Sequence, residues 1–249
     1  QDEEGHVRTT VAYGDHPSQI AHIREPEGGG PAPVAVLLHG GWWRDRFDAS
    51  LMDPLSQDLV DAGWAVWNVE YRRTGDDGGG WPQTLEDVEA ALTLLGETAA
   101  RGPGRHDLGR VVSIGHSAGG HLALLSALDT GRTPVTAVVA LAPITDLGRC
   151  AAEGLGEGAV GPFLGPAPAA RTYGESSPVS RVPLGLSQLV VHGDEDQRVP
   201  VEHSRDYVAA ARAAGDDVDY REIVGADHFA VIDPAHRAWR EVRGYLSGL

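Results

Sequence analysis

Apolar segments typical of strands alternate with segments of helical periodicity, and this alternation constrains the fold more than any other feature. The segments rich in Val, Ile, Leu and Ala cover residues 34–40, 65–71, 110–115, 135–143, 188–193 and 218–225. The helical patterns cover residues 50–62, 83–100, 117–129, 201–214 and 234–247. Most of the apolar segments are too continuous for a sheet with one solvated face. The pattern therefore predicts an α/β fold, with a mostly parallel sheet covered by helices on both faces.

Two segments fall outside this alternation. Residues 7–24 contain two strand-like runs around a Gly-Asp-His-Pro turn, which predicts an antiparallel hairpin at the sheet edge. Residues 145–187 contain eight Gly and five Pro without clear periodicity, so we expect a small cap over the carboxyl edge of the sheet. No repeat or linker divides the chain. We therefore expect one domain over residues 1–249, with the cap as an insertion.

Composition excludes several classes of function. All 20 basic residues are Arg, so no lysine is present for a Schiff base or a phosphate loop. The net charge of −16 argues against nucleic acid and anionic membranes as partners and mildly disfavours anionic substrates. A single Cys excludes an intrachain disulfide and an all-Cys metal site.

The chain contains no stretch of about 18 apolar residues, and its first residues lack the pattern of a signal peptide. A cytoplasmic protein is therefore the default expectation, although the chain does not begin with Met. The sequence does not exclude a homodimer.

Ser117 lies between an apolar strand-like run and an Ala/Leu-rich helical run, in the pattern Gly-x-Ser-x-Gly. The glycines at 115 and 119 let a nucleophilic serine occupy a sharp turn between a strand and a helix. The alternative is that Ser117 only caps the helix. A cap needs no flanking glycines, so we favour the nucleophile.

A serine nucleophile needs a histidine base and an acid, in the chain order Ser, acid, His. Asp194, Glu195 and Asp196 follow the apolar run that ends at residue 193, and His228 follows the last strand-like segment. We favour Asp196, but charge alone does not separate it from Asp194. The segment "HGG" at 39–41 ends the first long strand and can supply oxyanion-hole amides from Gly41 and Trp42, together with the amide of Ala118.

Five segments together resemble the α/β-hydrolase superfamily. They are "HGGWW" at 39–43, "EYRR" at 70–73, "GHSAGGHLA" at 115–123, "HGDEDQRVP" at 192–200 and "DHF" at 227–229. They look like its esterase branch, which includes kynurenine formamidase-like enzymes and carboxylesterases related to hormone-sensitive lipase. The resemblance implies an α/β-hydrolase fold and, by position, assigns the acid to Asp196. Glu70 departs from it, because lipase-like members usually carry Asp there.

The resulting hypothesis is hydrolysis of a small carboxylic ester or an aryl formamide through an acyl-enzyme on Ser117, without metal or organic cofactor. Trp43, Trp81 and Phe229 are the predicted substrate-binding residues, because aromatic rings can stack on an acyl or aryl group. Two alternatives remain. One keeps the triad for a thioesterase, peptidase or acyl-transfer reaction, and the other is a non-catalytic binding module.

Overall fold

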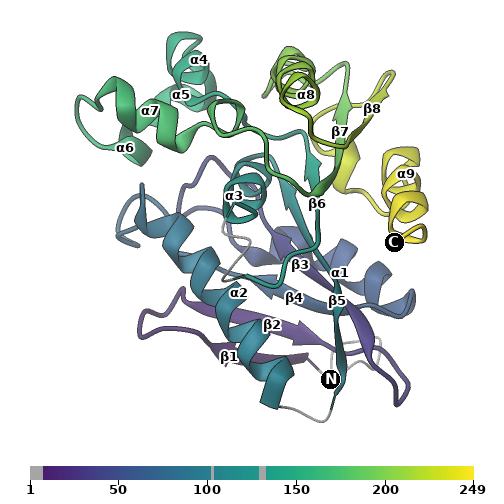
Figure 1. Ribbon diagram of the computed structural model, residues 1–249. Helices are drawn as coiled ribbons and strands as arrows, with labels where there is room; N and C mark the ends of the chain where they lie inside the picture. The colour runs from purple at the N-terminus through teal and green to yellow at the C-terminus, as the bar shows by residue number, and fades with distance from the viewer. Residues whose placement is uncertain (1–7, 102–103, 129–132) are drawn as a thin grey trace.

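The computed structural model describes residues 8–101, 104–128 and 133–249 (Figure 1). Val7, the first residue of the predicted hairpin, and Asp129, the last residue of the predicted helix at 117–129, lie outside these ranges. Within them the chain forms an eight-stranded sheet. The strands are β1 (Arg8–Ala12), β2 (Ile20–Arg24), β3 (Ala32–Leu38), β4 (Ala65–Val69), β5 (His106–His116), β6 (Ala137–Leu141), β7 (Ser187–Gly193) and β8 (Val218–Ile223).

The sheet order is β1-β2-β4-β3-β5-β6-β7-β8. Strands β1 and β2 form the expected antiparallel hairpin at one edge, and β2 also pairs antiparallel with β4. All remaining neighbours are parallel. Leu38 pairs with Gly115 and His116 with Leu141, so the strand ends of β3, β5 and β6 meet at one edge. The loops that follow these strands therefore share that edge.

Helices cover both faces of the sheet, as predicted. Helices α1 (Asp53–Asp61) and α9 (Arg237–Leu246) pack apolar side chains against one face. Helices α2 (Gln83–Arg101), α3 (Ala118–Ser126) and α8 (Glu202–Ala214) cover the other. Two short 3₁₀ turns, η1 (Ala49–Met52) and η3 (Ala230–Ile232), precede α1 and α9. In the described ranges, no helix is long and apolar enough to cross a bilayer.

Residues 145–187 are more regular than their sequence indicates. They form α4 (Leu147–Ala152), α5 (Leu155–Gly158), α6 (Val160–Leu164), α7 (Ala170–Ser176) and the 3₁₀ turn η2 (Pro178–Ser180). Each helix is too short to show a periodic pattern, and Figure 1 shows α4–α7 as one cluster beyond α3. The cluster is tied to the loops after β3 and β4, because Arg44 donates to the Gly156 carbonyl (2.5 Å) and the Trp81 amide to the Phe163 carbonyl (2.7 Å).

Candidate active site

Ser117 lies in a sharp turn between β5 and α3. Its backbone has φ 55° and ψ −115°, a conformation that L-residues rarely adopt and that is strained. A Cβ at residue 115 would lie 2.1 Å from the Gly119 carbonyl oxygen, and one at residue 119 would lie 2.0 Å from the Leu38 carbonyl oxygen. Both positions therefore require glycine, as the motif predicts.

The side chain of Ser117 does not cap α3. Ser117 occupies the N-cap position, but its side chain makes no capping hydrogen bond. Its Oγ is buried and has no hydrogen-bond partner within the described part of the chain. A buried hydroxyl without a partner costs stability, so the arrangement does not fit the capping alternative.

Asp196 and His228 form a direct pair behind this serine. His228 Nδ1 donates to Asp196 Oδ2 at 2.6 Å, which leaves His228 Nε2 as the unprotonated ring nitrogen. His228 and Ser117 line the same cavity. Asp194 is instead exposed and accepts a hydrogen bond from the Gly225 amide. Of the two acids that the sequence does not distinguish by charge, the structure thus pairs Asp196 with His228 and leaves Asp194 exposed.

Asp196 is held as an ionised acceptor. Its Oδ1 accepts the amides of Arg198 and Val199, at 2.8 and 2.9 Å. Its Oδ2 also accepts His192 Nε2 at 3.1 Å. Burial raises the pKa of Asp196, but the hydrogen bonds from His192 and His228 outweigh it and leave the pKa well below the ordinary value.

The loop after β3 has an unusual backbone. Gly41, Trp42 and Trp43 have consecutive positive φ values of 117°, 56° and 56°. Strained conformations of non-glycine residues concentrate at functional sites. Gly41 and Trp42 line the cavity together with Ser117. Ala118 is the first residue of α3, where a backbone amide has no acceptor within the helix. The three residues predicted to form the oxyanion hole are thus placed around one cavity or beside Ser117.

His116, the residue before Ser117, is a residue of the site that the sequence motifs do not predict. Its Nε2 donates to the carbonyl of His228 at 3.0 Å, and the two rings lie 4.6 Å apart. Burial, with the nearby His228, holds the pKa of His116 well below its ordinary value. A neutral His116 therefore fixes the backbone of the His228 loop. Its position, buried directly before Ser117, is the signal that could have identified it.

The three predicted substrate-binding residues lie in different environments. Phe229 is 40% exposed and lines the cavity. Trp43 is fully buried, stacks on Phe163 at 4.2 Å and donates to His121 Nδ1, so it belongs to the core and cannot contact a substrate. Trp81 is half-buried against Phe163 and does not line the cavity. For Trp43 and Trp81 the substrate-binding prediction is therefore not supported.

The cavity around Ser117 is small, about 20 Å³. Its described lining consists of Gly41, Trp42, Phe47, Leu51, His116, Ser117, Arg198, His228 and Phe229. Four of these lining residues, Phe47, Leu51, His116 and Arg198, are absent from the sequence predictions, and they come from separate segments that only the fold brings together. None of the described lining residues comes from the cap at 145–187.

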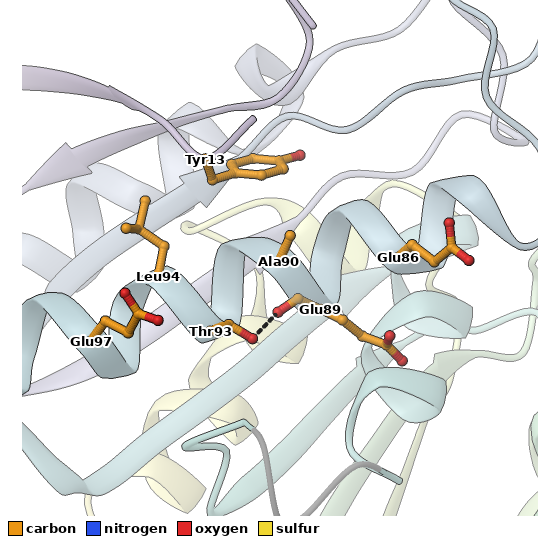
Figure 2. A pocket seen from close by; sticks show the side chains of 7 residues that line it. All are labelled: Tyr13, Glu86, Glu89, Ala90, Thr93, Leu94 and Glu97. Atoms are coloured by element: carbon orange, nitrogen blue, oxygen red, sulfur yellow. Dashed lines mark hydrogen bonds between the residues drawn. The ribbon is translucent and has the colours of Figure 1, made fainter. Parts of the chain in front are cut away.

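A larger hollow, about 610 Å³, lies between Tyr13 and the exposed side of α2 (Figure 2). Its lining residues are Tyr13, Glu86, Glu89, Ala90, Thr93, Leu94 and Glu97. These side chains include no serine, cysteine or histidine. The groups suited to acyl chemistry are in the smaller cavity.

Comparison with known proteins defines the family. The family model described as BD-FAE matches residues 22–210. The chain belongs to the BD-FAE family. Among curated proteins of Mycobacterium tuberculosis, it is 29% identical to "Esterase LipC" over 92% of this chain and 61% of LipC, and 31% identical to "Esterase LipQ" over 79% and 50%. The chain therefore spans about half to three fifths of the length of these relatives.

Solved structures show that this BD-FAE chain has the α/β-hydrolase fold of esterases. A "Truncated form of carbohydrate esterase from gut microbiota" aligns with TM-score 0.82 and 21% identity, over 99% of this chain and 97% of that chain. "Bacterial Heroin Esterase" aligns with TM-score 0.80 and 22% identity, over 98% and 83%. Both comparisons confirm the predicted α/β-hydrolase fold. The strand pairing within this chain confirms the N-terminal hairpin on a mostly parallel sheet.

Proposed function

We propose that this chain is a serine carboxylesterase that cleaves esters of short acyl groups through an acyl-enzyme on Ser117. The observation that carries the proposal is that His228, paired with Asp196, lines the same cavity as Ser117, which has a strained backbone and no hydrogen-bond partner for Oγ in the described part of the chain. The BD-FAE family and the esterase names of the relatives LipC and LipQ support an ester as the substrate.

In this mechanism His228 Nε2 accepts the Ser117 proton while Oγ attacks the ester carbonyl. Amides of the loop at Gly41 and Trp42, with that of Ala118, stabilise the negative oxygen of the tetrahedral intermediate. His228 then donates the proton to the leaving alkoxide. Water, deprotonated by His228, attacks the acyl-enzyme and releases the acid and free Ser117. Asp196 keeps the proton on Nδ1 and stabilises the imidazolium.

The cavity volume supports a short acyl group. A space of about 20 Å³ holds roughly one water-sized probe, comparable to a methyl group. An acetyl ester fits this size, and so does the formyl group of an aryl formamide, which is the second candidate substrate. Trp42, Phe47 and Leu51 are apolar side chains of this lining, and they leave little room for a longer acyl chain beside Ser117.

The test is a hydrolysis panel of p-nitrophenyl acetate, butyrate and octanoate, with a feruloyl ester, N-formylkynurenine and an aminoacyl arylamide. We expect acetate to be cleaved fastest and Ser117→Ala to lose activity by about 10⁴-fold or more. A fluorophosphonate should label Ser117. A dominant rate on N-formylkynurenine would assign the formamidase, and one on the arylamide a peptidase. Full activity of Ser117→Ala would refute the mechanism.

A further inference from the structure

We propose that Arg198 binds an anionic group on the alcohol part of the ester, so that preferred substrates are short-acyl esters of alcohols or phenols bearing a carboxylate or similar anion. The inference rests on the proposed esterase function and names the substrate class of the same site. The proposed preference for an anionic substrate is opposite to the expectation from the net charge of −16, which disfavours anionic substrates. A local cation at a cavity mouth decides recognition more directly than the charge of the whole surface.

Arg198 is fixed relative to the triad. Its backbone amide donates to Asp196 Oδ1 at 2.8 Å, and its side chain lines the cavity that contains Ser117. The guanidinium lies over the ring of Phe229, with Cζ 5.0 Å from the ring centroid. The backbone bond and the cation–π contact together place the cation beside the residue that follows His228.

The donors of Arg198 are available to a ligand. In the part of the chain that the structure describes, its guanidinium makes no ion pair and no hydrogen bond, although 36 acidic residues are present in the sequence. A guanidinium has five N–H donors, and its cation–π contact with Phe229 is no hydrogen bond to another side chain. These donors can bind a carboxylate in a bidentate manner.

Other cations reinforce this side of the cavity. Arg46 lies 5.1 Å from the ring centroid of Phe47, another lining residue. A hydrogen bond from Arg44, followed by the charges of Arg44, Arg46 and Arg198, lowers the pKa of Glu157. Glu157 is the acid paired with Arg44, at 2.9 Å, and its side chain is 80% exposed. Arg44, Arg46 and Arg198 are thus close enough to one another for all three charges to act on the same acid.

The reaction geometry assigns the anion to the alcohol part. His228 must donate a proton to the leaving oxygen, so the alcohol part lies on the His228 side of the cavity. The ring of Phe229 is 5.4 Å from that of His228, and Arg198 stacks on Phe229. The oxyanion loop at Gly41 and Trp42 contributes other lining residues, for the carbonyl oxygen and the small acyl group.

The test compares two isosteric esters, 4-acetoxybenzoate and 4-acetoxybenzamide, which differ in the charge of the para group. We expect kcat/KM to favour the benzoate by about 5-fold in the wild type, as for a partly solvated ion pair. Arg198→Gln should reduce this ratio to about 1. Arg110→Gln is the matched control: it makes the same change of charge near the start of β5, away from the strand ends, and should keep the wild-type ratio.

Binding to the Ser117→Ala protein, measured by titration calorimetry with the same two esters, gives a readout that needs no hydrolysis. Tighter binding of the benzoate, lost in the double variant with Arg198→Gln, supports the anion site. Equal binding, or an unchanged kcat/KM ratio in Arg198→Gln, overturns it and leaves the esterase proposal intact. Loss of hydrolysis on every ester of the panel refutes the esterase instead, and the binding comparison still decides on the anion site.

Discussion

Nε2 of His39 lies 2.9 Å from Oε1 of Glu70, and this buried pair connects the start of the loop after β3 to the residue that follows β4. The second carboxylate oxygen accepts the Ala49 amide at 2.8 Å. The other face of the contact is aromatic: Tyr71 stacks on His39 at 4.3 Å and donates its hydroxyl to the His39 carbonyl. His39 Nδ1 donates to the carbonyl of Gly40. Glu70 is therefore a positioning residue for the loop.

We predict that Glu70→Gln lowers kcat by about 10-fold with little change in KM, because only the oxyanion stabilisation of the transition state is disturbed. The two oxygens of Glu70 face His39 Nε2 and the Ala49 amide. Glutamine replaces one of these oxygens with an NH₂ group, which cannot accept a hydrogen bond, so one of the two contacts is lost. Steady-state kinetics on p-nitrophenyl acetate measure the effect. Glu86→Gln, the same change at an exposed position of α2, serves as control and should behave as the wild type. A rise in KM alone would contradict a positioning role.

The two neighbouring acids should differ sharply. Asp196→Asn is expected to lower kcat/KM by about 10⁴-fold, because an amide no longer favours the imidazolium and the correct tautomer of His228. Asp194→Asn should stay within a few-fold of wild type, since Asp194 is exposed and, among the residues that the structure describes, accepts only the Gly225 amide. Circular dichroism confirms folding of both variants. Comparable losses in the two variants would reopen the choice between the acids.

His121 should make the protein less stable towards acid. It is fully buried, where Nδ1 accepts Trp43 Nε1 and Nε2 donates to the Ser176 carbonyl, and burial lowers its pKa to about 4. The unfolded chain binds a proton near pH 6.5 and the folded chain only near pH 4, so protonation favours unfolding as the pH falls between these values.

The expected loss for His121 reaches about 3 kcal/mol at the low end of this window. Urea unfolding at several pH values should show His121→Gln with a weaker pH dependence than the wild type. A residual slope will remain, because the pKa values of His116 and His203 are also lowered. A difference between variant and wild type that does not change from pH 6.5 to 4 would exclude this role.

Much of the site was predictable because α/β folds place functional residues at strand ends, in a fixed chain order. Ser117, Asp196 and His228 each follow a strand, and the short glycine-rich turns identify where those strands end. Motif spacing alone predicts that Ser117 and His228 lie close to one acid from the turn after β7. Whether Asp194 or Asp196 faces His228 depends on the turn after β7, and local residues alone did not decide it.

Other features depend on tertiary contacts that motifs do not encode. Trp42 and Trp43 are adjacent and chemically identical, but the backbone of the loop directs Trp42 to the cavity and Trp43 into the core beside Phe163. Helices α4–α7 are short, and such helices depend on packing rather than on propensity. The contact between Arg198 and Phe229 also depends on the tertiary structure, so the sequence does not predict that Arg198 lies at the cavity.

Gly156 supports Trp42 from the cap. A Cβ at Gly156 would lie 2.4 Å from Cδ2 of the Trp42 indole, and its φ is +60°. Gly154, in the same segment, has a φ of +67°, but a Cβ at this position would have no other atom within 4 Å. Alanine at either position has the same backbone cost, about 1 kcal/mol. Only Gly156→Ala adds a collision with the ring that lines the cavity.

We predict that Gly156→Ala lowers kcat/KM for p-nitrophenyl acetate by about 10-fold, because the displaced indole moves the amide of Trp42 and narrows the acyl space. Gly154→Ala should retain wild-type kinetics and lose less unfolding free energy than Gly156→Ala, because it has the backbone cost without the collision. Kinetics and urea unfolding of both variants separate the two effects. If both variants lose activity equally, backbone strain in the cap is responsible. If neither loses activity, contact between Gly156 and Trp42 has no part in shaping the cavity.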